Sequence, residues 1–127
     1  MGSPVAKGRP RFSMHGGVPH TYTPQKTRDY EALIAQEARL AGCTPSEKPL
    51  KMTVEAWFLL PKSKDALRKI ESNLGQCTKK PDVDNIFKIY GDALNGIAYL
   101  DDSQIYSGTC TKGYADVECV DVTLEYD

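Results

Sequence analysis

Alternating apolar and polar residues between positions 50 and 60 limit the fold of this chain more than any other feature. The segment LKMTVEAWFLLP has an apolar residue at every second position, in the order Leu50, Met52, Val54, Ala56, Phe58 and Leu60. This period of two is typical of a β-strand with one buried face, and Pro61 ends it. The buried face needs a covering layer, so we expect the strand to lie in a sheet packed against helices.

Helix signals occur on both sides of this strand. Thr23 and Pro24 are residue types that favour an N-cap and a first helical position, and a helix is predicted over residues 23–42. A second main helix is predicted from about residue 85 to 94, between a proline and an Asn-Gly pair. Residues 62–80 are rich in charge, and we expect a short helix within a mobile loop there.

Further strands are predicted near both ends of the chain. Residues 103–114 and 117–126 have strand-like patterns, and a turn is expected near residues 112–113. Residues 4–13 are predicted to be extended. The expected fold is therefore α/β, an α+β-type mixed sheet of three to four strands with two main helices packed on it, in a single domain over residues 1–127.

Composition agrees with one globular unit. The chain has 127 residues, is 40% hydrophobic and 26% charged, and contains no apolar run as long as a membrane span, so we expect a soluble cytoplasmic protein without a membrane partner. Its cysteines are far apart and form no C-x-x-C pair, which argues against a zinc site or a disulfide framework. We predict that all four are reduced and structural: Cys43, Cys77, Cys110 and Cys119.

The net charge of −1 hides a strong division along the chain. Residues 1–80 contain 14 Lys and Arg against 7 Asp and Glu, whereas residues 81–127 contain 2 against 10. This division suits a protein that binds a polyanion with one surface and a cation with another. A second interpretation stays open, in which the two halves neutralise each other where they pack.

Five aspartates lie close together in residues 79–105, the segment KKPDVDNIFKIYGDALNGIAYLDDSQI. Helical spacing groups its apolar residues on one face, namely Ile86, Ile89, Tyr90, Ala93, Leu94 and Ile97. Asp84, Lys88 and Asp92 are four residues apart and fall on the opposite side. The acidic stripe is therefore expected to face solvent.

Two explanations of these carboxylates are possible. An aspartate is an ordinary helix cap, and Asp84 with Lys88 is an ordinary i,i+4 ion pair. However, Asp82 and Asp84 repel each other at close range, and Asp101-Asp102 add two more carboxylates before a strand. A cation would remove that repulsion. Magnesium binds through one or two carboxylates together with water and phosphate oxygens, which favours a magnesium site.

Several motifs together resemble a known family. They are PVAKGRPRFS, YTPQKTRDYEALI, KPDVDN, the lysine at Lys88, DALNG and DDSQI, and they extend over nearly the whole chain. In this order they resemble the RusA family of crossover-junction endodeoxyribonucleases, which resolve four-way Holliday junctions in DNA.

The resemblance implies an enzyme and assigns roles to residues. Asp82, Asp84 and Asp102 match the essential metal-binding carboxylates of the family, and Lys88 matches its catalytic lysine. It also implies a homodimer, dependence on Mg²⁺ with Mn²⁺ as a substitute, branched DNA as the partner, and frequent carriage on phages or prophages. The product would be a pair of symmetric nicks.

Three neighbouring residues are expected to support this site, each with an open alternative. Asp101 would lie in the outer shell of the metal site or face DNA. Asp92 would orient Lys88 or cap a neighbouring loop. Asn85 would bond to a ligating carboxylate or simply cap the helix. Lys88 itself would stabilise transition-state charge or help to place the attacking water, or it would be no more than one half of a surface ion pair.

DNA binding is expected to come mainly from phosphate contacts by basic side chains. The candidates are Lys7, Arg9, Arg11, Lys62, Lys64, Lys69, Lys79 and Lys80, and the alternative for each is a solvated surface charge. Two other functions remain open. One is a protein that binds branched DNA without cutting it, and the other is a broader structure-selective nuclease acting on forks and flaps.

Overall fold

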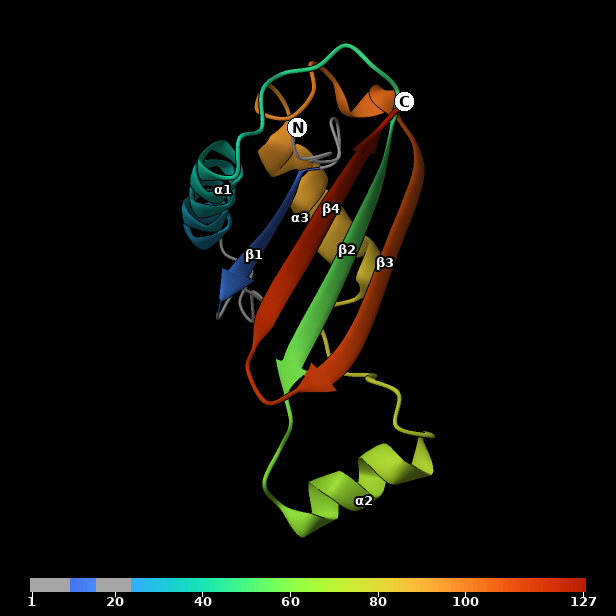
Figure 1. Ribbon diagram of the computed structural model, residues 1–127. Helices are drawn as coiled ribbons and strands as arrows, with labels where there is room; N and C mark the ends of the chain where they lie inside the picture. Colours follow the sequence, from blue (N-terminus) through green and yellow to red (C-terminus); the bar gives the residue numbers. More distant parts are fainter. Residues whose placement is uncertain (1–9, 16–23) are drawn as a thin grey trace, which may run out of the picture.

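The computed structural model describes residues 10–15 and 24–127, which form one four-stranded sheet with its helices (Figure 1). The strands are β1 (Arg11–His15), β2 (Leu50–Leu59), β3 (Ile105–Ala115) and β4 (Cys119–Tyr126). The helices are α1 (Pro24–Leu40), α2 (Lys64–Ser72) and α3 (Val83–Leu94), with a short 3₁₀ turn, η1 (Asp102–Gln104), before β3. The predicted mixed sheet with helices packed on it is confirmed. The proposed N-cap Thr23 lies outside the described residues.

The sheet has the strand order β1-β4-β2-β3. Strand β4 is antiparallel to both β1 and β2, whereas β2 and β3 are parallel. The prediction of a turn near residues 112–113 is wrong, because both residues lie within β3 and the connection to β4 falls at residues 116–118. Since β2 separates β3 from β4, these two consecutive strands do not pair with each other.

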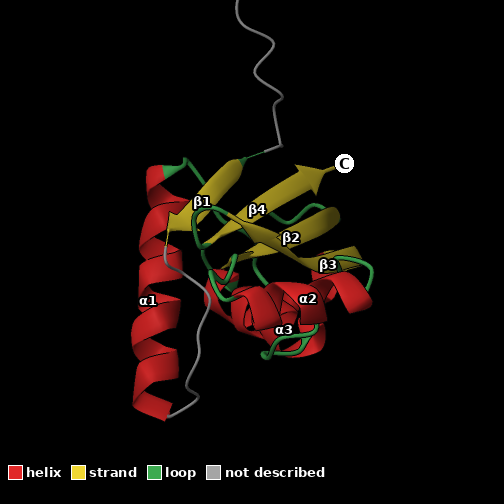
Figure 2. Cartoon of the chain, turned by 90° about the horizontal axis from the view of Figure 1, so that it is seen from below, coloured by secondary structure: helices red, strands yellow, loops and turns green. Residues whose placement is uncertain are grey.

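The parallel pair explains where the helices lie. Parallel neighbours cannot be joined by a tight turn, so the chain must cross from one end of the sheet to the other. It does so through α2 and α3, and α3 contacts both β2 and β3. Seen from below, α1 and α3 lie on the same side of the sheet (Figure 2). The opposite face of the sheet has no helix from the described part of the chain (Figure 2).

The core lies between that covered face and the helices. The predicted alternation in β2 is confirmed, since Leu50, Met52, Val54, Ala56 and Phe58 are all buried. The strand ends one residue early, and Leu60 is exposed. The buried partners on the helices and on the edge strand β1 are Ile34, Ala38, Ile86, Ile89, Tyr90, Leu94, Phe12 and Met14. Continuous burial of this kind is the main force that holds the helices on the sheet.

Helices α1 and α3 also make a specific contact with each other. The hydroxyl groups of Tyr30 and Tyr90 are 2.5 Å apart, and the two rings pack edge to face with centroids 5.9 Å apart. Tyr90 is fully buried, so its hydroxyl group needs this partner. The contact links the helix that carries Lys88 to the long helix α1.

Helix α2 is packed differently from the other two. It begins at the Ser63 cap, whose Oγ accepts a hydrogen bond from the backbone N–H of Ala66, and none of its residues is buried. Figure 1 shows α2 projecting beyond the ends of β2 and β3, away from the core. The predicted short helix is confirmed.

Two other expectations concern the cysteines and membranes. All four cysteines are free, and burial raises the pKa of the Cys110 thiol to about 11, so this thiol is protonated and unreactive at neutral pH. Among residues 10–15 and 24–127, no helix has the length and apolar character needed to span a bilayer.

Candidate active site

The N-terminus of α3 brings the first pair of carboxylates into position. The helix begins at Val83, two residues before the predicted start, and Asp82 is its N-cap residue. The Asp82 side chain makes no capping hydrogen bond, so its carboxylate oxygens are not used up by the helix. Asp84 lies in the first turn, where the helix dipole stabilises negative charge. Asn85 lies in the first turn of the helix and is not its N-cap residue.

The two faces of α3 divide as the spacing predicts. Ile86, Ile89, Tyr90, Ala93 and Leu94 are buried, which holds the helix in one rotation about its axis. Asp84, Lys88 and Asp92 therefore point to the exposed side. Packing of the apolar face thus sets the direction of the polar side chains.

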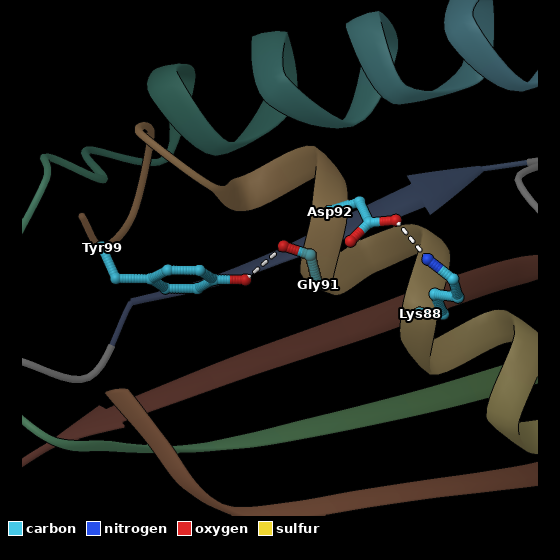
Figure 3. Close-up of polar contacts among 4 residues, drawn as sticks. All are labelled: Lys88, Gly91, Asp92 and Tyr99. Atoms are coloured by element: carbon cyan, nitrogen blue, oxygen red, sulfur yellow. Dashed lines mark hydrogen bonds and ion pairs between the residues drawn. The ribbon is translucent and has the colours of Figure 1, made fainter. Parts of the chain in front are cut away.

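Lys88 forms an ion pair with Asp92, at 3.0 Å between Nζ and Oδ2 (Figure 3). Asp84 and Asp92 both lie four residues from Lys88 in the sequence, and the lysine pairs with Asp92 and not with Asp84. The hydrogen bond and charge of Asp92, with smaller contributions from Glu31 and Asp102, raise the pKa of Lys88. The lysine is therefore a permanent cation at neutral pH, and Asp92 is placed to orient it.

The second pair of carboxylates lies on the turn that precedes β3. Asp101 is the N-cap residue of η1 and Asp102 its first residue, and both side chains are exposed. Desolvation, together with the neighbouring carboxylates of Asp101 and Asp92, raises the pKa of Asp102. A hydrogen bond of 2.9 Å from the Ser103 hydroxyl group helps to lower the pKa of Asp101. Negative charge is thus concentrated around Asp102.

A cleft of about 340 Å³ joins the exposed side of α3 to this turn. Its lining residues are Phe87, Lys88, Gly91, Asp92, Asp102, Ile105, Tyr106 and Gly108. We call this the acidic cleft. The fold brings Asp102 together with Lys88 and Asp92, residues that are 10 or more positions apart in sequence. Asp82 and Asp84 do not line the cleft and lie at the start of the same helix.

Gly108 allows the close contact that forms one wall of the acidic cleft. A Cβ atom at Gly108 of β3 would lie 2.5 Å from Cζ of Phe87, which is closer than any real side-chain contact. The Phe87 ring therefore packs directly on the strand backbone. This close approach keeps α3 against β3 beside the cleft.

The donor chemistry fits a hard divalent cation such as Mg²⁺. Asp82, Asp84 and Asp102 are exposed oxygen donors, and Mg²⁺ binds through one or two carboxylates with water completing its shell. In the part of the chain that the structure describes, no three His, Cys, Asp or Glu side chains are gathered closely enough to hold a metal ion together, so the structure does not bring Asp82, Asp84 and Asp102 into one ligand set. The arrangement suits an open site with water and substrate ligands better than a closed structural site.

Two supporting residues were missed in the sequence analysis. The hydroxyl group of Tyr99, a fully buried residue, donates a 2.6 Å hydrogen bond to the carbonyl oxygen of Gly91 (Figure 3). It thereby ties the segment after α3 to the helix. Lys112 of β3 donates from Nζ to the carbonyl oxygens of Lys79 and Pro81, at 2.6 and 3.2 Å, just before Asp82. A single lysine in a strand gives no local signal of such a distant contact.

Removing the Tyr99 hydroxyl group is expected to lower the free energy of unfolding. In Tyr99→Phe the Gly91 carbonyl oxygen loses a buried partner, which costs about 1–3 kcal/mol. Urea denaturation followed by circular dichroism measures the change. Tyr106→Phe is the matched control, because the Tyr106 hydroxyl group bonds to Asp127 at an exposed position and its loss should cost less. Equal losses in the two variants would contradict the role given to Tyr99.

The predicted DNA contacts fall on separate parts of the molecule. Lys7 and Arg9 lie outside the described residues, and Arg11 is exposed at the start of the edge strand β1. The remaining cations lie on α2 or on the segments that flank it, and they are Lys62, Lys64, Lys69, Lys79 and Lys80. We call these five the α2 cations. The Lys79 ammonium group also lies 6.0 Å from the centre of the Phe58 ring.

Comparison with known proteins agrees with this arrangement. The family described as "Endodeoxyribonuclease RusA" matches residues 1–125 of the chain. The chain is also 38% identical over 130 residues to "Uncharacterized protein YqaN" of Bacillus subtilis (strain 168), a match that covers 97% of this chain and 90% of that protein. The match to the family extends over the sheet, α3 and the acidic cleft alike. The chain belongs to the RusA family of endodeoxyribonucleases.

Proposed function

We propose that this protein is a divalent-metal-dependent endonuclease that cuts four-way DNA junctions by paired, symmetric nicks. The observation that carries the proposal is the acidic cleft, where the cation Lys88 lies with Asp102, on the same helix whose N-terminus carries Asp82 and Asp84. Such a combination of carboxylates and a cation is suited to phosphodiester hydrolysis. Membership of the endodeoxyribonuclease family supports it.

Asp82, Asp84 and Asp102 are the residues that would hold the metal. Mg²⁺ or Mn²⁺ bound there would supply Lewis-acid charge and a more acidic water. Side chains of the protein would supply the remaining stabilisation of the transition state. Lys88, held by Asp92, would place a positive charge beside the phosphate in the transition state. Because its pKa is raised, Lys88 would act as a cation and not as a general base.

The α2 cations would supply much of the DNA affinity. They lie on the projecting helix and its flanking segments, where a duplex arm can approach without entering the core. Phosphate contacts of this kind carry no sequence information and position the DNA. A carboxylate-rich cleft repels DNA unless a cation neutralises it, so metal binding and DNA binding would support each other.

Symmetric nicking requires two active sites. A two-fold homodimer presents the same site twice in opposite orientations, which suits the near-symmetry of a four-way junction. Light scattering after gel filtration would give the oligomeric state. A DNA substrate would require the protein to act inside the cell, and we propose the cytoplasm.

The deciding experiment compares a labelled synthetic four-way junction, a fork and a linear duplex of the same sequence, each with Mg²⁺ or with a chelator. The proposal expects paired nicks in the junction that depend on Mg²⁺. Cutting of the fork at the same rate would indicate a broader structure-selective nuclease. Tight junction binding without cutting under any metal would indicate a DNA-binding protein instead.

Salt dependence tests the α2 cations separately from catalysis. Lys79→Ala with Lys80→Ala is expected to weaken junction binding and to reduce the slope of log affinity against log salt by about 2, since each lost phosphate contact removes about 0.9. Fluorescence anisotropy at several salt concentrations measures the slope. Arg39→Ala with Lys51→Ala removes the same charge from α1 and β2 and serves as the control. An unchanged slope in the test variant would exclude these phosphate contacts.

A further inference from the structure

The side chain of Gln104 makes four hydrogen bonds next to the turn that contains Asp101 and Asp102. Its Oε1 accepts hydrogen bonds from the backbone N–H groups of Leu100 and Asp101, both at 2.9 Å. Its Nε2 donates to the carbonyl oxygens of Ser46 and Lys48, at 2.7 and 2.9 Å. A carboxamide has two acceptor sites and two donors, so every one of them is satisfied. The four partners also determine which atom is nitrogen and which is oxygen.

The bond from Asp101 to the Gln104 oxygen belongs to an ordinary local cap. A glutamine at the third position of a helical turn often accepts from the N-cap backbone, and Asp101 is the N-cap residue here. A cap needs only the oxygen of the carboxamide. The nitrogen instead reaches residues that are 56 and 58 positions away in sequence. This second half has no function in capping, and it joins the turn to another part of the fold.

The segment that receives these bonds is itself anchored. Ser46 Oγ accepts from the backbone N–H of Lys48 at 3.1 Å, and the Pro49 carbonyl oxygen accepts from Asp127 at 3.1 Å. The next residue, Leu50, starts β2 and is fully buried. The carbonyl oxygen of Ser46 also accepts from Leu100 at 3.2 Å. Gln104 therefore fastens the turn to the central strand of the sheet through a short, well-bonded segment.

We infer that Gln104 is a positioning residue, whose carboxamide holds the Asp101-Asp102 turn so that the Asp102 carboxylate stays in the acidic cleft with Lys88, where it would bind the proposed cation. The inference rests on the proposed function. Asp101 and Asp102 are neighbouring, exposed anions that repel each other and lie on a 3₁₀ turn of only three residues. Such a short turn offers little internal resistance to rotation of its backbone. Local bonds join the Ser103 hydroxyl group and the Gln104 backbone N–H to Asp101, whereas the Gln104 carboxamide ties the turn to the segment before β2.

Gln104→Met tests this inference, because methionine has a similar length and lacks all four hydrogen bonds. We expect Mn²⁺ affinity, measured by electron paramagnetic resonance without DNA, to fall by about 10–100-fold, the range found when groups that orient metal ligands are lost. The Mg²⁺ concentration for half-maximal junction cleavage should rise by a similar factor. Amide exchange at Asp101 should become faster, because its N–H group loses its acceptor, whereas the Leu100 N–H group keeps the Ser46 carbonyl oxygen.

Tyr126→Phe is the matched control for a purely structural effect. The Tyr126 hydroxyl group donates a 2.6 Å hydrogen bond to the Ala98 carbonyl oxygen, so it anchors the same connection without contacting the carboxylate turn. The variant should lose thermal stability and keep its Mn²⁺ affinity. If Gln104→Met does not fold, Gln104→Asn replaces it, since asparagine keeps the carboxamide and is one methylene group too short to span both segments.

The outcomes separate this inference from the proposed function. A folded Gln104 variant with wild-type Mn²⁺ affinity would overturn the positioning role, even if its amides exchanged faster. A wild-type protein that cuts no DNA structure would overturn the proposed nuclease, whereas the Mn²⁺ and exchange measurements would still decide the role of Gln104. Weaker Mn²⁺ binding in the Gln104 variant but not in Tyr126→Phe would support the inference.

Discussion

Asp84→Asn is expected to lower the rate of junction cleavage by about 10³-fold, because loss of a metal-binding carboxylate removes several kcal/mol of transition-state stabilisation. Junction binding in the absence of metal should be equal or tighter. The substitution removes one negative charge from the exposed N-terminus of α3, where Asp84 is not needed as the cap. Single-turnover cleavage and anisotropy binding, performed on the same preparation, measure the two effects.

Asp65→Asn is a close control for this variant. Asp65 lies in the first turn of α2 as Asp84 lies in the first turn of α3, and it is likewise exposed. The control should keep full cleavage activity. Comparable losses in both variants would show that a helix-terminal charge, and not a metal-binding carboxylate, had been removed. Full activity in Asp84→Asn would refute its assignment as a ligand.

Lys88→Met should lower the cleavage rate constant by about 10²–10³-fold, the effect of deleting one group aimed at developing charge. Methionine keeps the aliphatic stem and removes the cation. Because the hydrogen bond to Asp92 raises the pKa of Lys88 above its ordinary value near 10.4, the lysine is charged throughout the usual assay range. The shape of the pH–rate profile below pH 10 should therefore be the same in the variant as in the wild type, at a lower level.

Two further variants define how Lys88 acts. Asp92→Asn removes its charged partner and should give a smaller loss than Lys88→Met, since the cation remains but is less well oriented. Arg68→Met removes a cation from a comparable exposed ion pair on α2, with Asp65 at 3.7 Å, and should leave the rate constant unchanged. If Lys88→Met behaved like Arg68→Met, Lys88 would be no more than half of a surface ion pair.

The sequence predicted those features that depend on residues close together in the chain. The alternation in residues 50–60 predicted β2 and its buried face, and helical spacing predicted which side of α3 is buried. The error in the start of α3 also has a local cause. Pro81 disfavours helix at the residue before it, whereas Asp82 occupies the N-cap position with extended backbone and helical geometry begins at Val83.

Contacts between distant segments were not predictable in the same way. Strand-like patterns at residues 103–126 contained no information that β2 would lie between β3 and β4. That order follows from the parallel pairing of β2 with β3, which the crossover through α2 and α3 makes possible. Likewise, Asp84 and Asp92 are equally spaced from Lys88 in sequence, and only the structure shows the pair with Asp92.

The sequence by itself determined the chemical character of this protein: an acidic stripe and one lysine on the exposed side of a helix, a basic first part of the chain, and the motifs of an endonuclease family. Only the tertiary structure decided that Asp102 would meet Lys88 and Asp92 in one cleft, and that Gln104 would fasten the Asp102 turn to the segment before β2. The physical reason is that helix and strand periods fix the face of each residue locally. The position of one face against another is set by packing and hydrogen bonds between segments far apart in the chain.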